Sequence, residues 1–370
     1  MKILYISTII STIDAFLIPH IKKLCECGNR IDIAGNKNIK ISTELKSIVN
    51  NIFNLSLQRT PFSFKNLLAL KSLITILKEN KYDVVHVHTP VASVIGRIAC
   101  WLTKTRCIYT AHGFHFYKGA PLLNWLIYFP IELFLSFFTD TLITINNEDY
   151  EFAKKHLHAR RIEYVPGVGI DVEKFANVKI DRNAKRRKLG IPENCKLLLS
   201  VGELNNNKNH QLVLKVLSQI EDKNIHYAIC GVGKIHDYLL NFAKKLNISD
   251  KLHSLGRRND IAEILKCADI FVHPSLREGL PVALMEAMAS GLPCVASDIR
   301  GCRDLIDDQK GGYLCDVNDS QSFAKTINKL SLNPQLRYSM GNCNKERIKE
   351  FDISFVEKEI QNIYRNVLGK

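Results

Sequence analysis

Short apolar runs alternate with longer amphipathic stretches along the chain. In the first half, the runs that predict strands are 2–6, 30–34, 52–57, 84–87, 107–110 and 141–145. Helical stretches lie between them, for example at 64–79 and 92–102. Strands that alternate with helices are typical of a parallel sheet that is covered on both faces. The first half therefore predicts a doubly wound α/β domain.

The same rhythm restarts after a polar, basic connector at 178–196. The second series of strand-like runs is 196–201, 225–230, 251–255, 269–273, 293–296 and 312–315. We therefore expect an α/β protein with two Rossmann-like doubly wound domains facing across a cleft, at 1–175 and 176–351. An amphipathic helix at 352–370 is expected to pack back on the first domain. Ligands of such sheets bind beyond the carboxyl ends of the strands, so a nucleotide-like ligand suits this edge.

One segment of the second series, "HPSLREGLPVALMEAMASGLP", combines a strand end, a turn and a strongly apolar helix. Pro281 suits the first position of the helix, and Gly291 suits its end. Glu286 is the one ionisable residue of this helix, and burying an unpaired carboxylate is costly. A pair of ribose hydroxyls would supply the hydrogen-bond donors that Glu286 needs. A lysine from a neighbouring element is the alternative partner.

The turn before this helix has the features of an anion site. Backbone N–H groups of Gly279, Leu280 and Val282, around Pro281, lie at the positive end of the helix, where phosphate groups bind readily. Glu278 precedes them and is placed where a sugar beyond the phosphates would lie. Alternatively, Glu278 complements the helix dipole.

This segment resembles the signature of the retaining family 4 glycosyltransferases, which have the two-domain GT-B architecture. In that family the C-terminal domain holds a nucleotide-sugar donor. The resemblance implies that Glu278 contacts the transferred sugar and that Glu286 contacts the ribose. "SVGELNNNKNH" at 200–210 resembles the loop whose lysine, here Lys208, binds the diphosphate. Gly202 and Asn205 of this loop are further candidates for donor binding.

Two more segments carry the resemblance, which covers essentially the whole chain. "LHSLGRRNDI" at 252–261 resembles the loop that borders the base, with Arg258 as a donor-binding candidate. "YTAHGFHFYKG" at 109–119 resembles the segment whose histidine, here His112, approaches the donor sugar. Many relatives have an arginine where this chain has Glu203. Many also have a Gly-Gly turn where this chain has "TIISTID", so Ser11 and Thr12 are candidates for the acceptor loop.

The resemblance is strongest to bacterial enzymes that extend lipid-linked oligosaccharides for capsule or exopolysaccharide. It implies sugar transfer from a nucleoside diphosphate sugar, with UDP as the expected nucleotide, to a polyprenyl-linked saccharide. Glu278, His112 and Lys208 are the expected catalytic residues. No Asp-x-Asp motif is present, so we expect no cofactor and no obligatory metal. We also expect His86 and His88 to point to opposite faces of their strand and so to form no metal site.

The charge of the chain narrows the choice of partners. The formal net charge is +14, and residues 1–175 hold 21 Lys and Arg against 14 Asp and Glu. Such a field suits nucleotide diphosphates, anionic lipid surfaces or nucleic acid. No cluster of basic and aromatic residues and no zinc-finger spacing is present, so nucleic acid is not expected. The oligomeric state stays open.

The stretch 121–140 is strongly apolar but is interrupted by Asn124, Pro130 and Glu132. It is either a core helix or a partly exposed helix that rests on a bilayer. Lys118 and Trp125 fit placement at a membrane interface. Because the eleven cysteines show no paired framework and no secretory signal opens the chain, we expect a cytoplasmic protein, peripheral at the inner face of the plasma membrane.

Two other functions stay open on the sequence. A nucleotide-sugar 2-epimerase has the same architecture but acts on the donor alone and needs no lipid acceptor. A non-catalytic basic protein that binds nucleotides or nucleic acid would explain the net charge. The apolar stretch at 121–140 and the pair of glutamates disfavour the epimerase. The non-catalytic protein would show binding to polynucleotides that weakens steeply with salt, whereas a transferase should release nucleoside diphosphate when an acceptor is present.

Overall fold

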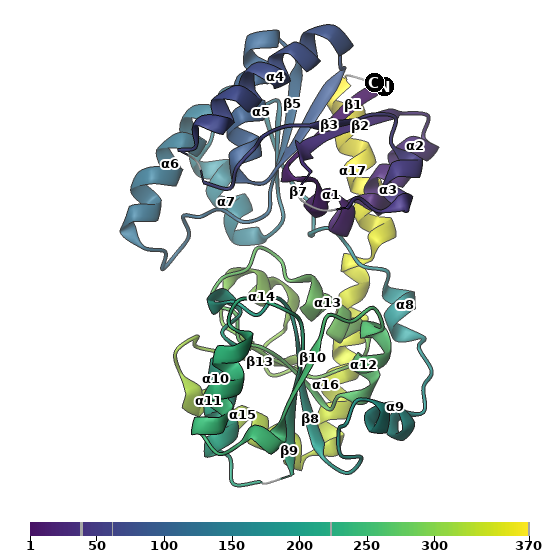
Figure 1. The fold of residues 1–370 in the computed structure, drawn as a ribbon, viewed down its shortest axis with the longest axis vertical. Coiled ribbons are helices and arrows are strands. Elements are labelled where there is room, and N and C mark those ends of the chain that lie inside the picture. Colours follow the sequence, from purple (N-terminus) through teal and green to yellow (C-terminus); the bar gives the residue numbers. More distant parts are fainter. Residues whose placement is uncertain (38–39, 61, 223, 369–370) are drawn as a thin grey trace. The chain divides into compact units, whose positions relative to one another are not determined.

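The computed structural model describes residues 1–37, 40–60, 62–222 and 224–368. The chain forms two compact units, Met1–Val168 with Ile353–Lys370 (unit 1) and Gly169–Asp352 (unit 2). The sequence placed these divisions at 175/176 and 351/352. Each unit is a parallel sheet with helices on both faces (Figure 1), which confirms the two doubly wound α/β domains.

Unit 1 contains seven parallel strands in the order β3-β2-β1-β4-β5-β6-β7. The strands are β1 (Lys2–Ile9), β2 (Arg30–Asn36), β3 (Ile52–Asn54), β4 (Val84–His88), β5 (Arg106–Ala111), β6 (Thr141–Thr144) and β7 (Arg161–Tyr164). The first six coincide with predicted runs, with ends that differ by a few residues. Edge strand β7 was missed because its sequence, RIEY, contains no apolar run.

The sheet of unit 1 separates two apolar cores. The helices are α1 (Ile10–Phe16), α2 (Ile18–Glu26), α3 (Thr43–Ile48), α4 (Phe64–Asn80), α5 (Pro90–Thr103), α6 (Leu122–Ser136), α7 (Asn147–His156) and α17 (Ile353–Leu368). Leu4 and Ile6 of β1 point into the core under α4 and α5. Ile3 and Tyr5 point into the opposite core, which α17 completes with Val356, Ile360, Ile363 and Tyr364. The C-terminal helix is thus an integral part of unit 1.

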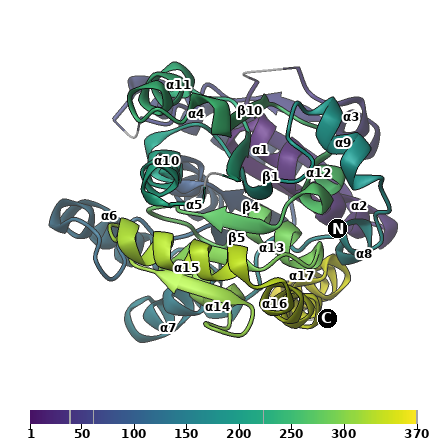
Figure 2. The ribbon, with the colours of Figure 1, turned by 90° about the horizontal axis from the view of Figure 1, so that it is seen from below.

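Unit 2 contains six parallel strands in the order β10-β9-β8-β11-β12-β13, and all six were predicted. They are β8 (Lys196–Val201), β9 (Ile225–Cys230), β10 (Leu252–Gly256), β11 (Ile270–His273), β12 (Cys294–Ser297) and β13 (Gly312–Cys315). The helices are α8 (Val172–Ala176), α9 (Arg182–Lys188), α10 (His210–Gln219), α11 (His236–Lys245), α12 (Ile261–Cys267), α13 (Val282–Ala289), α14 (Arg300–Leu305), α15 (Ser320–Leu332) and α16 (Pro334–Arg347), with short 3-10 turns η1 (Asn206–Lys208), η2 (Ser249–Lys251) and η3 (Ile348–Phe351). Helices α10 and α15 pack side by side on one face (Figures 1 and 2), and α13 packs against α8 and α16.

Both strand orders reverse direction at one point, between β1 and β4 in unit 1 and between β8 and β11 in unit 2. The connections from these central strands diverge to opposite sides of the sheet and leave a crevice at the carboxyl edge, where ligands bind in doubly wound folds. In unit 2, the loop with Lys208 follows β8 and the turn with Glu278 follows β11. The fold therefore brings the predicted donor residues to the edge where a ligand site forms.

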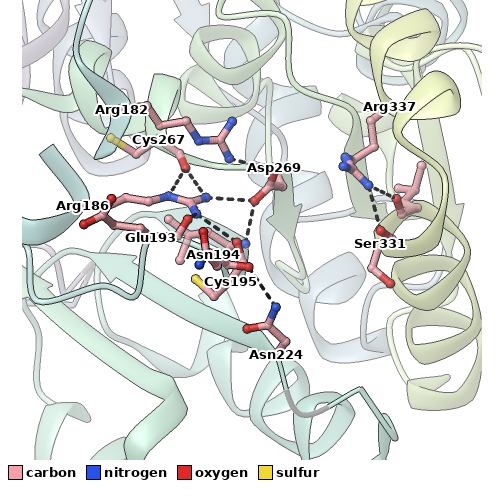
Figure 3. A network of polar contacts seen from close by, with 12 residues as sticks. Arg182, Arg186, Glu193, Asn194, Cys195, Asn224, Cys267, Asp269, Ser331 and Arg337 are labelled. Carbon is pink, nitrogen blue, oxygen red and sulfur yellow. Dashed lines mark hydrogen bonds and ion pairs between the residues drawn. The ribbon is translucent and has the colours of Figure 1, made fainter. Parts of the chain in front are cut away.

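A buried arginine fastens the basic connector to the opposite, amino edge of the unit 2 sheet (Figure 3). Arg186 of α9 is 2% exposed and donates to the carbonyl oxygens of Glu193, Cys195 and Cys267 at 2.7–3.1 Å. Its Nη2 also lies 2.9 Å from Asp269 Oδ2, which accepts the backbone N–H of Leu197 as well. The guanidinium thus ties α9 to the starts of β8 and β11.

Replacing Arg186 by Met should lower the free energy of unfolding by about 3 kcal/mol, because a buried carboxylate and three carbonyls lose a donor. Urea unfolding monitored by circular dichroism measures this loss. Arg187→Met on the same helix is the control, since Arg187 forms an exposed pair with Glu193 and should change the midpoint little. Equal midpoints for the two variants would contradict the anchoring role of Arg186.

Candidate functional site

The loop after β8 presents Lys208 through a short, well-fastened turn. The side chain of Asn205 accepts the backbone N–H of Lys208 at 3.0 Å and so closes η1. A Cβ atom on Gly202 would lie 3.3 Å from Cε of Lys208, and the lysine stem therefore lies directly on the glycine backbone. Gly202 and Asn205 thus position Lys208 in the structure.

Lys208 and Glu278 meet across the switch point of unit 2. Nζ of Lys208 lies 2.6 Å from Oε1 of Glu278, and Nε2 of His273 donates to the same oxygen at 3.2 Å. Burial alone would raise the pKa of Glu278, but the hydrogen bond from His273 and the charge of Lys208 hold it well below its usual range. Glu278 is therefore a carboxylate at neutral pH, and its partners are internal basic groups rather than the helix dipole alone.

The turn that carries Glu278 is fixed from both sides. The backbone N–H of Leu276 donates to the carbonyl of Asn207 at 2.8 Å, and Asn207 Nδ2 donates to the carbonyl of Arg277 at 2.9 Å. From α14, Arg300 Nε donates to the carbonyl of Glu278 at 3.1 Å. A rigid turn of this kind can present its backbone N–H groups in a fixed direction.

Helix α13 begins one residue later than predicted, because Pro281 is its N-cap and Val282 its first residue. Gly291 has φ 81°, which confirms the glycine-dependent end of the helix. The N–H groups of Gly279, Leu280 and Val282 donate to no protein acceptor within the described residues. This end of α13 therefore has the donors that an anion requires.

Glu286 lies in α13 among buried apolar residues, and its carboxylate forms no hydrogen bond or ion pair with any described residue. Burial raises the pKa of Glu286 to about 7, and the charge of Lys174 in α8 only partly opposes this shift. Lys174 thus acts at a distance and is not the lysine partner that the sequence left open. The side chain is half-buried, and its carboxylate is open to hydrogen bonds from a ligand.

A second glutamate in an apolar helix, Glu132, has an internal partner, unlike Glu286. Glu132 of α6 is 8% exposed and lies 2.8 Å from Nη2 of Arg97, which is 1% exposed. The hydroxyl of Tyr109 lies 3.4 Å from the other carboxylate oxygen of Glu132. The fold supplies Glu132 with an internal cation and leaves Glu286 without one, which marks Glu286 as a candidate for ligand binding.

Arg258 and Glu203 are two further residues of the predicted donor region. Arg258 donates through Nε and Nη2 to both carboxylate oxygens of Asp260, at 2.8 and 2.6 Å, and Asp260 also pairs with Lys185. Within the described residues, no hydrogen bond or ion pair joins Arg258 to Lys208 or Glu278. Glu203, which stands where relatives have an arginine, has an exposed side chain. Of the predicted cations, Lys208 is the one that the structure joins to the glutamate turn.

In unit 1, His112 follows the carboxyl end of β5 and belongs to a buried histidine cluster. Its Nε2 lies 3.0 Å from Nδ1 of His88, and the rings of His86 and His88 lie 4.2 Å apart between centroids. The expectation that His86 and His88 point to opposite faces was wrong, because residues two apart on a strand share a face. Among the described residues, no group of three or more His, Cys, Asp or Glu could hold a metal ion. His273 and His88 were both missed as site residues, although each ends a buried strand.

The remaining candidates of unit 1 lie in α1 and α6. Ser11 and Thr12 are in the first turn of α1, directly after β1, and both are half-buried. Helix α6 turns Glu132 inward but leaves several apolar side chains exposed, namely Leu122, Leu123, Leu126, Ile131 and Phe134. This pattern favours the partly exposed helix over the core helix. Trp125, which fits placement at an interface, is half-buried and packs against Phe116, Phe129 and Phe152.

Known families and structures match this arrangement over nearly the whole chain. The family described as glycosyl transferases group 1 matches residues 181–347, and the family described as glycosyl transferase 4-like matches residues 2–146. EpsD of Bacillus subtilis, named as a glycosyltransferase, is 34% identical over 98% of this chain and 96% of its own. The UDP-Gal:alpha-D-GlcNAc-diphosphoundecaprenol alpha-1,3-galactosyltransferase of Escherichia coli is 33% identical over 86% of this chain and 84% of its own.

The fold matches solved glycosyltransferase structures as well. HepE (Alr3699) of Anabaena in complex with UDP has a TM-score of 0.80 and 20% identity, and the match covers 99% of this chain and 100% of HepE. WaaG, a glycosyltransferase involved in lipopolysaccharide biosynthesis, has a TM-score of 0.78 and 17% identity over 98% of this chain and 99% of its own. These matches confirm the expected GT-B fold. The two family models and the 34% identity with EpsD show that the chain belongs to the group 1, family 4-like glycosyltransferases.

Proposed function

We propose that this enzyme transfers a hexosyl residue, with retention of configuration, from a UDP-sugar to a saccharide on a polyprenyl diphosphate lipid. The product would serve a bacterial surface polysaccharide such as capsule or exopolysaccharide. The observation that carries the donor assignment is the carboxylate of Glu286, which has no bonded partner among the described residues and lies in the helix that follows the turn of the Lys208–Glu278 pair. The name of the Escherichia coli relative supports a UDP-sugar donor and a lipid-linked acceptor, and HepE was solved with UDP.

In this proposal the diphosphate binds Lys208 and the N–H groups at the start of α13. These groups would stabilise the negative charge that develops on the leaving diphosphate, and a preorganised donor of this kind contributes about 3–4 kcal/mol to transition-state binding. Because Lys208 and Glu278 are in contact, a sugar attached to the diphosphate would lie within reach of Glu278. Arg258 is already held by Asp260, so Lys208 carries the principal charge in this mechanism.

The roles of unit 1 follow from the family resemblance. His112 would contact the donor sugar, and Ser11 and Thr12 would contribute to binding the acceptor. The proposal needs no cofactor or divalent metal, since Lys208 and backbone N–H groups take the role of the cation. Transfer should therefore continue in the presence of a chelator.

The binding of UDP-glucose should strengthen as pH rises from 6 to 8. With a pKa of about 7, most Glu286 side chains are protonated at pH 6 and ionised at pH 8, and only the carboxylate accepts strong hydrogen bonds from two hydroxyls. We expect the dissociation constant from calorimetry to fall roughly five- to tenfold over this range. Glu286→Gln should remove this dependence and weaken binding at pH 8 by at least about tenfold. Identical profiles for the two proteins would refute the ribose assignment.

Lys208→Met should raise the dissociation constant of UDP at least about tenfold more than that of uridine, because only UDP carries the diphosphate. Glu278→Gln should leave UDP affinity within a few fold but slow sugar transfer by roughly 10²-fold or more. Transfer is measured as UDP release with UDP-glucose, UDP-galactose or UDP-N-acetylglucosamine and polyprenyl-diphosphate-linked saccharides. Glu203→Gln in the same loop is the control. Near-wild-type turnover in both Lys208 and Glu278 variants would disprove these roles.

We further propose that α6 rests on an anionic lipid bilayer, as an enzyme with a lipid-linked acceptor requires. Leu122, Leu123, Leu126 and Phe134 are each 63–73% exposed, and the single charged residue of the helix, Glu132, is paired internally. The positive charge of residues 1–175 favours an anionic surface. No helix in the described part of the chain is long and apolar enough to cross a membrane.

Replacing Leu123 and Leu126 by Gln should lower partitioning onto phosphatidylglycerol vesicles by about tenfold, because two exposed leucines lose their apolar contact with the bilayer. Vesicle sedimentation measures the bound fraction. Leu332→Gln in unit 2, which is equally exposed at 70%, should leave partitioning unchanged. Equal partitioning of all three proteins would rule out α6 as the lipid contact.

A further inference from the structure

The contact between His88 and His112 determines which ring nitrogen of His112 carries its proton. The family resemblance does not determine this. His88 ends β4 and is 2% exposed, whereas His112 follows β5 and is half-buried. Nδ1 of His88 lies 3.0 Å from Nε2 of His112. A hydrogen bond between two imidazole nitrogens needs a proton on one of them and a lone pair on the other.

Both rings are neutral at physiological pH. Burial, reinforced by the neighbouring His86 and His112, lowers the pKa of His88 well below its usual value. Burial and the nearby His20 lower the pKa of His112 to about 4. Each ring therefore carries a single N–H, and two arrangements of the pair are possible. Either His88 donates from Nδ1, or His112 donates from Nε2.

The surroundings of His88 distinguish the two arrangements. Its Nε2 is buried and has no hydrogen-bond partner among the described residues. If His112 donated, the proton of His88 would lie on this Nε2 as a buried N–H without an acceptor, which proteins rarely tolerate. If His88 donates from Nδ1, its proton is used and Nε2 carries only a lone pair.

The packing of His88 also leaves its ring little freedom to turn. The ring stacks on Tyr5, with centroids 5.4 Å apart and planes at 16°, and lies against His86. His86 is itself held between the hydroxyls of Tyr364 and Thr110, each at 2.7 Å. The orientation of Nδ1 toward His112 is therefore set by residues of β4 itself, of the neighbouring strands β1 and β5, and of α17.

We propose that His88 is a positioning residue, which donates from Nδ1 to Nε2 of His112 and holds His112 as the tautomer with its proton on Nδ1. The Nε2 atom of His112 is then occupied, and its free polar group is an N–H donor. Resting on the proposed contact of His112 with the donor sugar, this arrangement means that His112 donates a hydrogen bond to a sugar oxygen. It does not act there as a base.

The tautomer can be measured without any assay of activity. Two-bond ¹⁵N–¹H spectra of protein labelled at its histidine nitrogens distinguish protonated from unprotonated ring nitrogens, and loss of signals in His112→Gln assigns His112. We expect a protonated Nδ1 and an unprotonated Nε2 for His112 at pH 7.5. A proton on Nε2 would overturn the proposal. Unit 2 contains a second histidine pair, in which Nδ1 of His226 lies 3.0 Å from Nε2 of His253. The signals of this pair serve as a reference within the same spectra.

Two variants test whether His88 is the cause. His88→Leu removes the donor, while His88→Asn places an amide N–H₂ close to the position of Nδ1. In His88→Leu, we expect His112 to lose its single tautomer and kcat/KM for the UDP-sugar to fall roughly five- to tenfold, with UDP affinity unchanged. His88→Asn should restore both, and His253→Leu should alter neither. An unchanged His112 tautomer in His88→Leu would overturn the proposal.

Different results would disprove the tautomer of His112 and its proposed contact with the donor sugar. If His112 has the expected tautomer but His112→Gln transfers sugar at the wild-type rate, the proposed contact of His112 with the donor is wrong and the role of His88 toward His112 stands. If the tautomer is wrong while His112→Gln is inactive, the proposed contact stands and the role of His88 is lost. Circular dichroism of each variant establishes that it is folded.

Discussion

The ion pair between Lys208 and Glu278 joins two segments that are 70 residues apart in the sequence. They meet because β8 and β11 are neighbours at the point where the strand order of unit 2 reverses. A parallel sheet must deliver both strand ends to the same edge, and the diverging connections keep that edge open. The hydrogen bonds of Asn207, Arg300 and His273 then fix the two side chains within contact distance. The topology thus creates the site, and the local bonds give it its geometry.

The free-energy cost of burying an ionised group explains why the other buried charged residues have internal partners. Each buried ionised group needs partners, and the fold supplies them to Glu132 through Arg97, to Asp269 through Arg186 and to Glu278 through Lys208 and His273. Glu286 differs from these residues: it is half-buried, its pKa is raised, and it has no bonded partner within the described residues. In the proposed function, the ribose hydroxyls of the donor give this carboxylate the hydrogen bonds that the described residues do not.

Much of the fold could be predicted from the sequence, because apolar runs and their spacing determine strands and helices locally. The pair of glutamates was also visible, since a lone carboxylate in an apolar helix is conspicuous. The partners of these residues were not visible. Nothing local indicates that Lys208 contacts Glu278, that Arg258 pairs with Asp260 or that His88 contacts His112, because each contact depends on tertiary placement or side-chain orientation. Strand β7 was missed because its sequence contains no apolar run. The common face of His86 and His88 was missed because the faces of the strand were assigned wrongly.

The central claim is that Glu286 and Lys208 form one binding site for a nucleoside diphosphate sugar. A crystal structure of the protein with UDP tests it most directly. The account predicts both ribose hydroxyls within hydrogen-bond distance of the Glu286 carboxylate and the diphosphate on Lys208 and the N–H groups of Gly279 and Leu280. A nucleotide bound elsewhere, with the Glu286 carboxylate still without a partner, would contradict it.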